Sequence, residues 1–248
     1  MGLFFNPRLR KVGNPIGLLA HIEDYTLREL NLLNEIDGRN QLIAKSKAIE
    51  AHFSMPKLKF PKMWEELSNQ HILVMEEITH PTLEKHLENN TLTWPDMLEL
   101  FRIHGAFMFG LGTFHGDLHP GNAMMDDEGN FHFIDTGAIC NAPEHVRNAL
   151  FGFFYFLAKG DLKNAFDAML TMAAVRPEGK TLQTYYDSMT ELYDGFVGTS
   201  VSEVSLTEQM MKTVKAAVLA GCAFGEEAFP IIRSLMYMDG MVLKGHPD

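Results

Sequence analysis

The segment HGDLHPGN at residues 115–122 constrains this chain more than any other, because it places two histidines, an aspartate and an asparagine beside a proline and two glycines. AMM, DDEGN and FHFID follow directly and predict two short strands joined by an acidic, glycine-containing turn. Strands advance by about 3.3 Å per residue, and neighbouring strands lie about 4.8 Å apart. A hairpin of this length would return Asp135 to the neighbourhood of Asn122, so that two oxygen ligands converge on one point.

This pair of oxygen ligands suits Mg²⁺, which keeps several waters and completes its coordination with phosphate oxygens of a substrate. Asp117 lies five residues before Asn122, the spacing of the kinase pattern D-x-x-x-x-N, in which the aspartate accepts a proton from the attacking hydroxyl. Asp135 opens the triplet D-T-G, where kinases carry D-F-G. We therefore expect Asp117 to be the catalytic base and Asn122 and Asp135 to be the metal ligands.

The two histidines of the loop admit a second interpretation. His115 and His119 form an H-x-x-x-H pair, which on a helix would bind zinc. Pro120 and Gly121 oppose such a helix. We expect instead that His115 braces the loop through hydrogen bonds and that His119 shapes it together with Pro120.

The chain before the loop predicts a short mixed region. Apolar residues at near-helical spacing predict a helix over residues 16–36, ended by Gly38. KMWEEL (62–67) and HILVMEEI (71–78) predict two strands joined as a hairpin by residues 68–70. This order of elements, followed by many helices, indicates a small mixed lobe packed on a larger helical one.

Helices dominate the rest of the prediction. Thr93, with Pro95 and Asp96 after it, predicts the N-terminus of a helix that runs to residue 112 and leads into the loop. From Pro143 onward we expect only helices. Their breaks are expected at Gly160, residues 176–180, residues 198–205 and near Gly225.

Composition and charge narrow the classes of function. The net charge of −11, without any basic run, argues against nucleic-acid binding. Cys140 and Cys222 form no C-x-x-C pair, and the N-terminal residues show no export signal, so a cytoplasmic location is expected. The apolar stretch at residues 149–158 is about half the length needed to cross a bilayer. It predicts a buried helix, with a membrane-facing helix as the alternative.

With these residues, the chain resembles the UbiB family of atypical kinases, also called AarF-domain or coenzyme Q biosynthesis kinases, whose loop has the pattern H-x-D-x-H-P-G-N. Aminoglycoside and choline phosphotransferases carry nearly the same loop, and the upstream segments distinguish the two groups. TLRELNLLNE (26–35) resembles the glutamate-bearing helix of the UbiB family, with Asn31 where the family has an aspartate. FPKMWEELSNQHILVMEEI (60–78) resembles the strand pair that leads to its nucleotide hinge.

The resemblance covers about residues 20–175 and implies an α+β, protein-kinase-like fold of two lobes. Residues 1–78 would form an abbreviated N-lobe, and residues 79–248 a large helical C-lobe with the catalytic loop and the metal-binding hairpin.

The same resemblance implies Mg²⁺ and ATP as cofactors. Glu35 would be the helix glutamate that pairs with the ATP-positioning lysine, and Met75, Glu76 and Glu77 would form the hinge whose backbone binds adenine. The family's role implies ATP-dependent support of quinone or isoprenoid-lipid metabolism. Lipids or quinone-biosynthesis proteins would then be partners, with peripheral contact to a membrane but no transmembrane segment.

Parts of the family pattern have no counterpart in this chain. The K-x-G-Q extension, the alanine-rich phosphate loop and the V-A-x-K strand are not found before the glutamate helix. Lys11 lies too close to Glu29 to replace them, and Lys45 and Lys47 would reach Glu35 only in a rearranged lobe. The chain is therefore expected to be either a truncated piece of a longer kinase or a short family member.

Three functions stay open from the sequence: an atypical kinase or ATPase, a small-molecule phosphotransferase of the aminoglycoside or choline kinase type, and a pseudokinase that acts as a binding module. The lysine and the phosphate loop of the family would stabilise charge on the phosphates. Their loss costs several kcal/mol of transition-state stabilisation, so slow turnover is expected.

Overall fold

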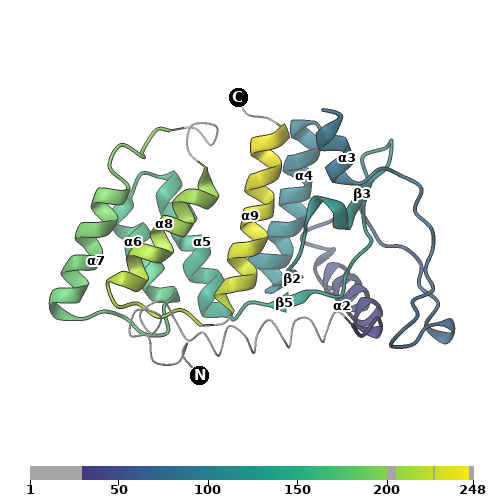
Figure 1. Cartoon of the computed structure of the whole chain (residues 1–248), viewed down its shortest axis with the longest axis horizontal. Coiled ribbons are helices and arrows are strands. Elements are labelled where there is room, and N and C mark those ends of the chain that lie inside the picture. The colour runs from purple at the N-terminus through teal and green to yellow at the C-terminus, as the bar shows by residue number, and fades with distance from the viewer. Residues whose placement is uncertain (1–29, 200–204, 226, 246–248) are drawn as a thin grey trace, which may run out of the picture.

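The computed structural model describes residues 30–199, 205–225 and 227–245, in which small sheets stand among many helices (Figure 1). In chain order, the helices are α2 (Leu33–Ile49), α3 (Leu83–Glu88), α4 (Trp94–Gly105), α5 (Glu144–Ala158), α6 (Leu162–Met172), α7 (Gly179–Leu192), α8 (Leu206–Leu219) and α9 (Ala228–Gly245). The strands are β1 (Leu58–Lys59), β2 (Thr113–His115), β3 (Ala123–Met125), β4 (Phe131–Phe133) and β5 (Ile139–Asn141). Shorter helices of other types are the 3₁₀-helices η2 (Glu65–Leu67) and η4 (Pro120–Asn122) and the π-helix η3 (Ala106–Leu111). The α+β class is confirmed.

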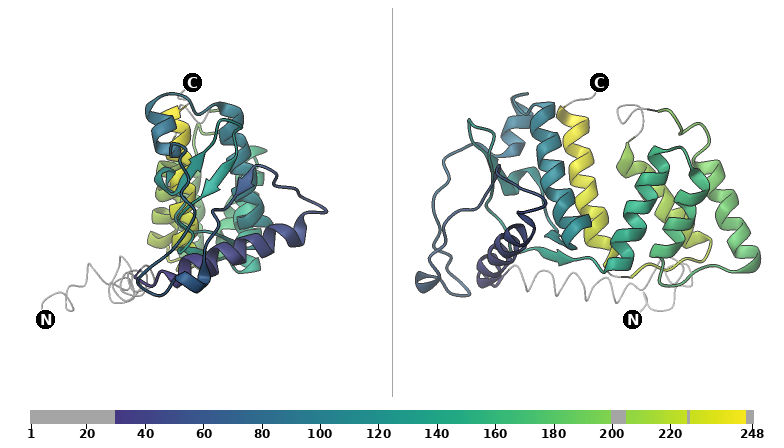
Figure 2. Two further views of the ribbon diagram at one scale, coloured as in Figure 1. Left: turned by 90° about the vertical axis from the view of Figure 1, so that its right-hand side faces the viewer. Right: turned by 180° about the vertical axis from the view of Figure 1, so that it is seen from behind.

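The helices and the sheets occupy different parts of the molecule. Helices α5 to α8 gather at one end, α4 and α9 lie side by side in the middle, and α2 lies with the strands toward the other end (Figures 1 and 2). One cluster of buried side chains extends through these parts, from Leu42 on α2 to Val242 on α9. The lobe boundary at residues 78 and 79 stays a prediction.

The predicted hairpin after the loop is confirmed. Strands β3 and β4 pair antiparallel, with Ala123 opposite Phe133 and Met125 opposite Phe131. Strand β1 pairs with the other edge of β4 in parallel, which gives the order β1-β4-β3. Gly129 closes the turn at a φ of 73°, a left-handed conformation that glycine adopts at little cost. Strands β2 and β5 form a second, two-stranded antiparallel sheet.

The predicted N-terminus of α4 is also confirmed. The Thr93 hydroxyl accepts a hydrogen bond from the amide of Asp96, and the Asp96 carboxylate accepts one from the amide of Thr93, which is a capping box. The helix continues as the π-turns of η3 and stops at Gly112, whose φ is 71°. Strand β2 follows at once and ends at His115, the first residue of the loop. The capping box at Thr93 therefore fixes the start of the helix that leads into the loop.

The helix end predicted at Gly38 is wrong, because α2 begins at Leu33 and runs through Gly38 to Ile49. Gly38 is buried, and a Cβ atom there would lie 1.9 Å from the backbone oxygen of Thr136. The glycine therefore serves a close approach between α2 and the D-T-G segment, not a helix terminus. Residues 16–29 of the predicted helix lie outside the described residues.

The hairpin predicted upstream of the loop is only partly correct. The two segments pair at Met63 and Met75, and the amide of Trp64 donates to the Val74 oxygen at 3.0 Å. However, Glu65–Leu67 forms the 3₁₀-helix η2 instead of a strand. We call residues 60–78 the strap, because isolated bridges hold it together instead of a continuous ladder.

The helical series after Pro143 and its predicted breaks are confirmed within the residues that the structure describes. The burial expected for residues 149–158 is wrong for one face of α5: Leu150 and Phe153 are buried, but Phe151 is 56% exposed and Tyr155 is 50% exposed. Over the described ranges, no helix combines the length and the apolar character that crossing a membrane requires.

Candidate functional site

The loop of residues 115–122 is braced from inside by His115. Its side chain is buried at the end of β2, and the centroid of its ring lies 5.7 Å from that of Phe133. The Nδ1 atom accepts a hydrogen bond from the amide of Asp117 at 3.2 Å. Burial lowers the pKa of His115 to about 4, so the ring is neutral at pH 7. The expected bracing role is confirmed.

His119 and Asn122 shape the second half of the loop. The amide of Gly121 donates to His119 Nδ1 at 3.0 Å, and the side-chain nitrogen of Asn122 donates to the backbone oxygen of Asp117 at 2.9 Å. The Nδ1 atom of each histidine in the H-x-x-x-H pair thus accepts a hydrogen bond from the backbone amide two residues later. The two histidines lie on a turned loop, whereas the zinc interpretation requires them on one helix.

The hairpin brings the second aspartate back to the loop. The amide of Ile134, one residue before Asp135, donates to the backbone oxygen of Asn122 at 3.2 Å. The amide oxygen of Asn122 and the carboxylate of Asp135 are hard oxygen donors, which is the chemistry that Mg²⁺ prefers. This donor set fits a magnesium ion, with Asp117 in the same loop.

Glu35 contacts the D-T-G segment instead of a lysine. The amide of Thr136 donates to Glu35 Oε2 at 2.5 Å, and the Thr136 hydroxyl donates to the backbone oxygen of Glu35 at 2.7 Å. Burial, together with the negative charge of Asp135, raises the pKa of Glu35 to about 7. Within the described part of the chain, Glu35 forms no ion pair with a lysine, and Lys45 and Lys47 are exposed further along α2.

The expected hinge residues lie on the strap. Met75 is half-buried, while Glu76 and Glu77 are exposed. The amide of Glu76 donates to the Lys62 oxygen at 2.8 Å, and its carboxylate accepts from the Lys62 amide at 3.0 Å. Because these contacts occupy the Glu76 amide, any adenine hydrogen bond to this segment would use the backbone of its neighbours.

Helix α9 contributes contacts that the sequence did not suggest. The Tyr237 hydroxyl hydrogen-bonds the side chain of Asp117, and burial and this bond raise the pKa of Tyr237. Arg233 Nε donates to the Gly116 oxygen at 3.0 Å. Tyr237 therefore positions the carboxylate expected to be the base. No motif marks these residues, which lie more than 100 residues after the loop.

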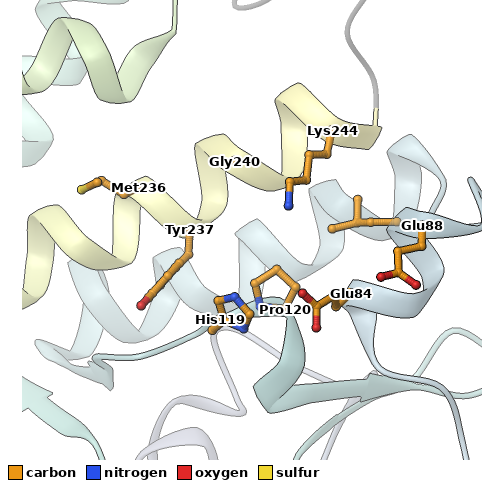
Figure 3. A pocket seen from close by; sticks show the side chains of 9 residues that line it. Glu84, Glu88, His119, Pro120, Met236, Tyr237, Gly240 and Lys244 are labelled. Carbon is orange, nitrogen blue, oxygen red and sulfur yellow. The ribbon is translucent and has the colours of Figure 1, made fainter.

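A cavity of about 460 Å³ opens beside the loop, between α3, η4 and α9 (Figure 3). His119 and Pro120 form one wall and Tyr237 another, with the ring centroids of His119 and Tyr237 5.4 Å apart in an edge-on contact. Glu84, Glu88 and Lys244 supply charges of both signs. The cavity has the size of small-molecule sites and lies next to the expected base.

Comparison with known proteins relates this chain to kinase-like families. Residues 4–169 match the model of the ABC1 atypical kinase-like domain. The probable protein kinase UbiB of Pasteurella multocida is 21% identical over 98% of this chain and 46% of its own length. The protein ACTIVITY OF BC1 COMPLEX KINASE 3, chloroplastic, of Arabidopsis thaliana is 23% identical over 93% of this chain and 32% of its own length.

A solved structure has the same fold. The complex of Rv3197 with erythromycin from Mycobacterium tuberculosis superposes with a TM-score of 0.58 at 16% identity, and the match covers 94% of this chain and 58% of Rv3197. Among the curated relatives named above, this chain spans about half of each relative's length or less. Its fold is kinase-like and α+β, as the resemblance implied.

Proposed function

This chain belongs to the ABC1 atypical kinase-like family, and we propose that it binds a magnesium–nucleotide complex between the catalytic loop and the D-T-G segment. The observation that supports this most is the closure of the hairpin, in which the Ile134 amide donates a hydrogen bond to the backbone oxygen of Asn122 at 3.2 Å. The antiparallel pairing of β3 with β4, and the bond from the Asn122 side chain to the Asp117 backbone oxygen, support a site shared by Asp117, Asn122 and Asp135.

Asn122 and Asp135 would hold the metal ion through their oxygen atoms. A bound Mg²⁺ neutralises charge on the phosphates that it contacts. Asp117, held by Tyr237, would accept the proton of an acceptor hydroxyl while the hydroxyl oxygen bonds to the terminal phosphorus and the bond to the leaving diphosphate breaks. The family resemblance supports a wider role in quinone or isoprenoid-lipid metabolism.

A binding role without turnover is the second candidate, and Glu35 favours it. Its carboxylate contacts the Thr136 amide, and the phosphate-binding lysine has no counterpart among the described residues. A nucleotide held by the loop alone would lack the charge that this lysine supplies, so the chain would report nucleotide occupancy to a partner without fast hydrolysis.

A small-molecule phosphotransferase is the third candidate. The cavity of about 460 Å³ beside His119 and Pro120 offers a place for an acceptor, and the structural neighbour Rv3197 was solved with erythromycin.

The first experiment is a melting titration with Mg-ATP and Mg-ADP. A ligand that binds only the folded chain adds RT ln(1 + [L]/Kd) to its stability, which is about 2.7 kcal/mol at a hundredfold excess over Kd. Asp135→Ala should abolish the magnesium-dependent shift. Asp127→Ala is the matched control, because Asp127 is an exposed aspartate in the turn of the same hairpin. An equal shift in the Asp135 variant, or no shift in the unaltered chain, contradicts the proposal.

Turnover then separates the candidates. Formation of ADP from Mg-ATP, alone and with erythromycin as a trial acceptor, should fall by about 10²- to 10⁴-fold in Asp117→Asn if Asp117 is the base. Nucleotide binding with equally low turnover in both proteins supports the binding role.

A further inference from the structure

Three side chains with metal-ligating atoms meet at the turn end of the β3–β4 hairpin. They are His80, which precedes α3, Asp126, which begins the turn, and His132 in the middle of β4. Their ligating atoms all lie within 4.8 Å of one another. Asn122 and Asp135 lie at the other end of the same hairpin, about three residues or roughly 10 Å away, so this cluster is separate from the nucleotide site.

The spacing within the cluster is close to that of a metal site. His132 Nε2 lies 3.1 Å from Asp126 Oδ2, and the ring centroids of His80 and His132 are 5.7 Å apart. Bonds of 2.0–2.1 Å to zinc place two tetrahedral ligands about 3.3 Å from each other. The side chains of His132 and Asp126 are only 16% and 15% exposed, so water competes weakly for their ligating atoms.

The backbone around the cluster is already ordered by other contacts. Asp126 Oδ1 accepts hydrogen bonds from the amides of Glu128 at 3.0 Å and Asn130 at 2.8 Å, while Oδ2 accepts one from the side-chain nitrogen of Asn130 at 2.9 Å and faces His132. The amide of Met125 donates to the oxygen of Pro81, next to His80, at 3.1 Å. An ion would therefore bind to ligands that are held in place, with little ordering cost.

We propose that His80, Asp126 and His132 bind a divalent ion such as Zn²⁺. Two imidazoles and one carboxylate suit zinc and its neighbours in the first transition row, whereas Mg²⁺ and Ca²⁺ take oxygen ligands. Three protein ligands leave a fourth position for water or another ligand, as in open zinc sites. The ion would join the segment before α3 to the hairpin that carries Asn122 and Asp135.

The test is a titration of Zn²⁺ into the metal-free chain, followed by calorimetry and by melting temperature. The Asp135→Ala background is used for every protein, so that binding at the catalytic loop does not contribute. One equivalent of Zn²⁺ should bind. His80→Ala should weaken this binding by more than about 100-fold, since even changes outside the ligand shell cost 10- to 100-fold.

Two further variants keep the test decisive. His132→Gln retains a side-chain donor toward Asp126 but removes the imidazole, so its loss of zinc binding would not reflect a broken turn. His71→Ala is the matched control, because His71 is an exposed histidine of the strap, and it should bind zinc like the background protein. Equal zinc affinity in the background, His80→Ala and His132→Gln proteins, or no zinc binding at all, would overturn the site. Nucleotide binding is not part of this readout.

Discussion

The catalytic loop and the strap are held in opposite ways. In the loop and the strand before it, Phe114, His115 and Leu118 are at most 1% exposed, and side-chain-to-backbone hydrogen bonds hold each turn. The strap has isolated bridges, and its Leu67 and Ile72 are 59% and 55% exposed. A buried, hydrogen-bonded loop keeps one geometry, whereas an exposed segment opens locally at low cost. The expected metal and base residues are therefore preorganised, and the expected hinge residues are not.

The largest effect is expected where α2 meets the D-T-G segment. Gly38→Ala would place Cβ 1.9 Å from the Thr136 oxygen, and both residues are buried, so the two elements must separate. We expect a loss of about 3 kcal/mol or more in the free energy of unfolding, measured by urea titration. Gly110→Ala is the matched control, because apart from its chain neighbours and its own helix backbone no atom lies within 4 Å of the position that its Cβ would take. Equal stability of the two variants would contradict the tight contact.

Acid should destabilise the loop through His115. Its folded-state pKa of about 4 lies below the unfolded value of about 6.5, so the unfolded chain binds the extra proton between these pH values. Stability is therefore lost as pH falls through this window, by roughly 2–3 kcal/mol at pH 4.5. His115→Gln should reduce this slope in urea titrations across pH. His71→Gln, on the exposed strap, is the matched substitution, and an unchanged slope in His115→Gln would contradict the prediction.

Glu35 should have the opposite pH dependence. Its pKa rises from 4.5 to about 7 on folding, so the folded chain binds the extra proton, and this contribution to stability is lost as pH rises through that window. Glu35→Gln mimics the protonated form and keeps an acceptor for the Thr136 amide. After allowance for solvent screening, we expect it to stabilise the metal-free chain by about 2 kcal/mol at pH 8 and by little at pH 4.5. Destabilisation at pH 8 would show that the charged carboxylate is required.

The smallest effect is expected on the strap. Glu77 is exposed, and the carboxylate that contacts Lys62 belongs to its neighbour Glu76, so Glu77→Ala should change the free energy of unfolding by less than about 0.5 kcal/mol. Backbone recognition of adenine would leave the Kd for Mg-ADP unchanged in this variant. Weaker nucleotide binding at unchanged stability would mean that the side chain itself contacts the ligand, and the two regions would then be more alike than their burial indicates.

Local patterns explain which expectations succeed. The capping box at Thr93 and the hairpin with Gly129 in its turn depend on residues close to each other in the chain, so their physical causes are visible in the sequence. The 3₁₀-turn at Glu65–Leu67 escapes prediction because alternating apolar residues in so short a segment do not distinguish a strand from a turn. Gly38 misleads because a glycine that ends a helix and one that allows a close contact look the same in sequence.

The sequence by itself determined the family, the α+β class and the loop with its three oxygen-bearing candidates, because their order along the chain carries the chemistry. Only the tertiary structure decided that Glu35 contacts the Thr136 amide, that Tyr237 holds Asp117, and that His80 meets Asp126 and His132. These contacts join residues far apart in sequence. They depend on how α2, α9 and the hairpin pack around one core. The spacing of residues within a short segment of sequence does not predict this packing.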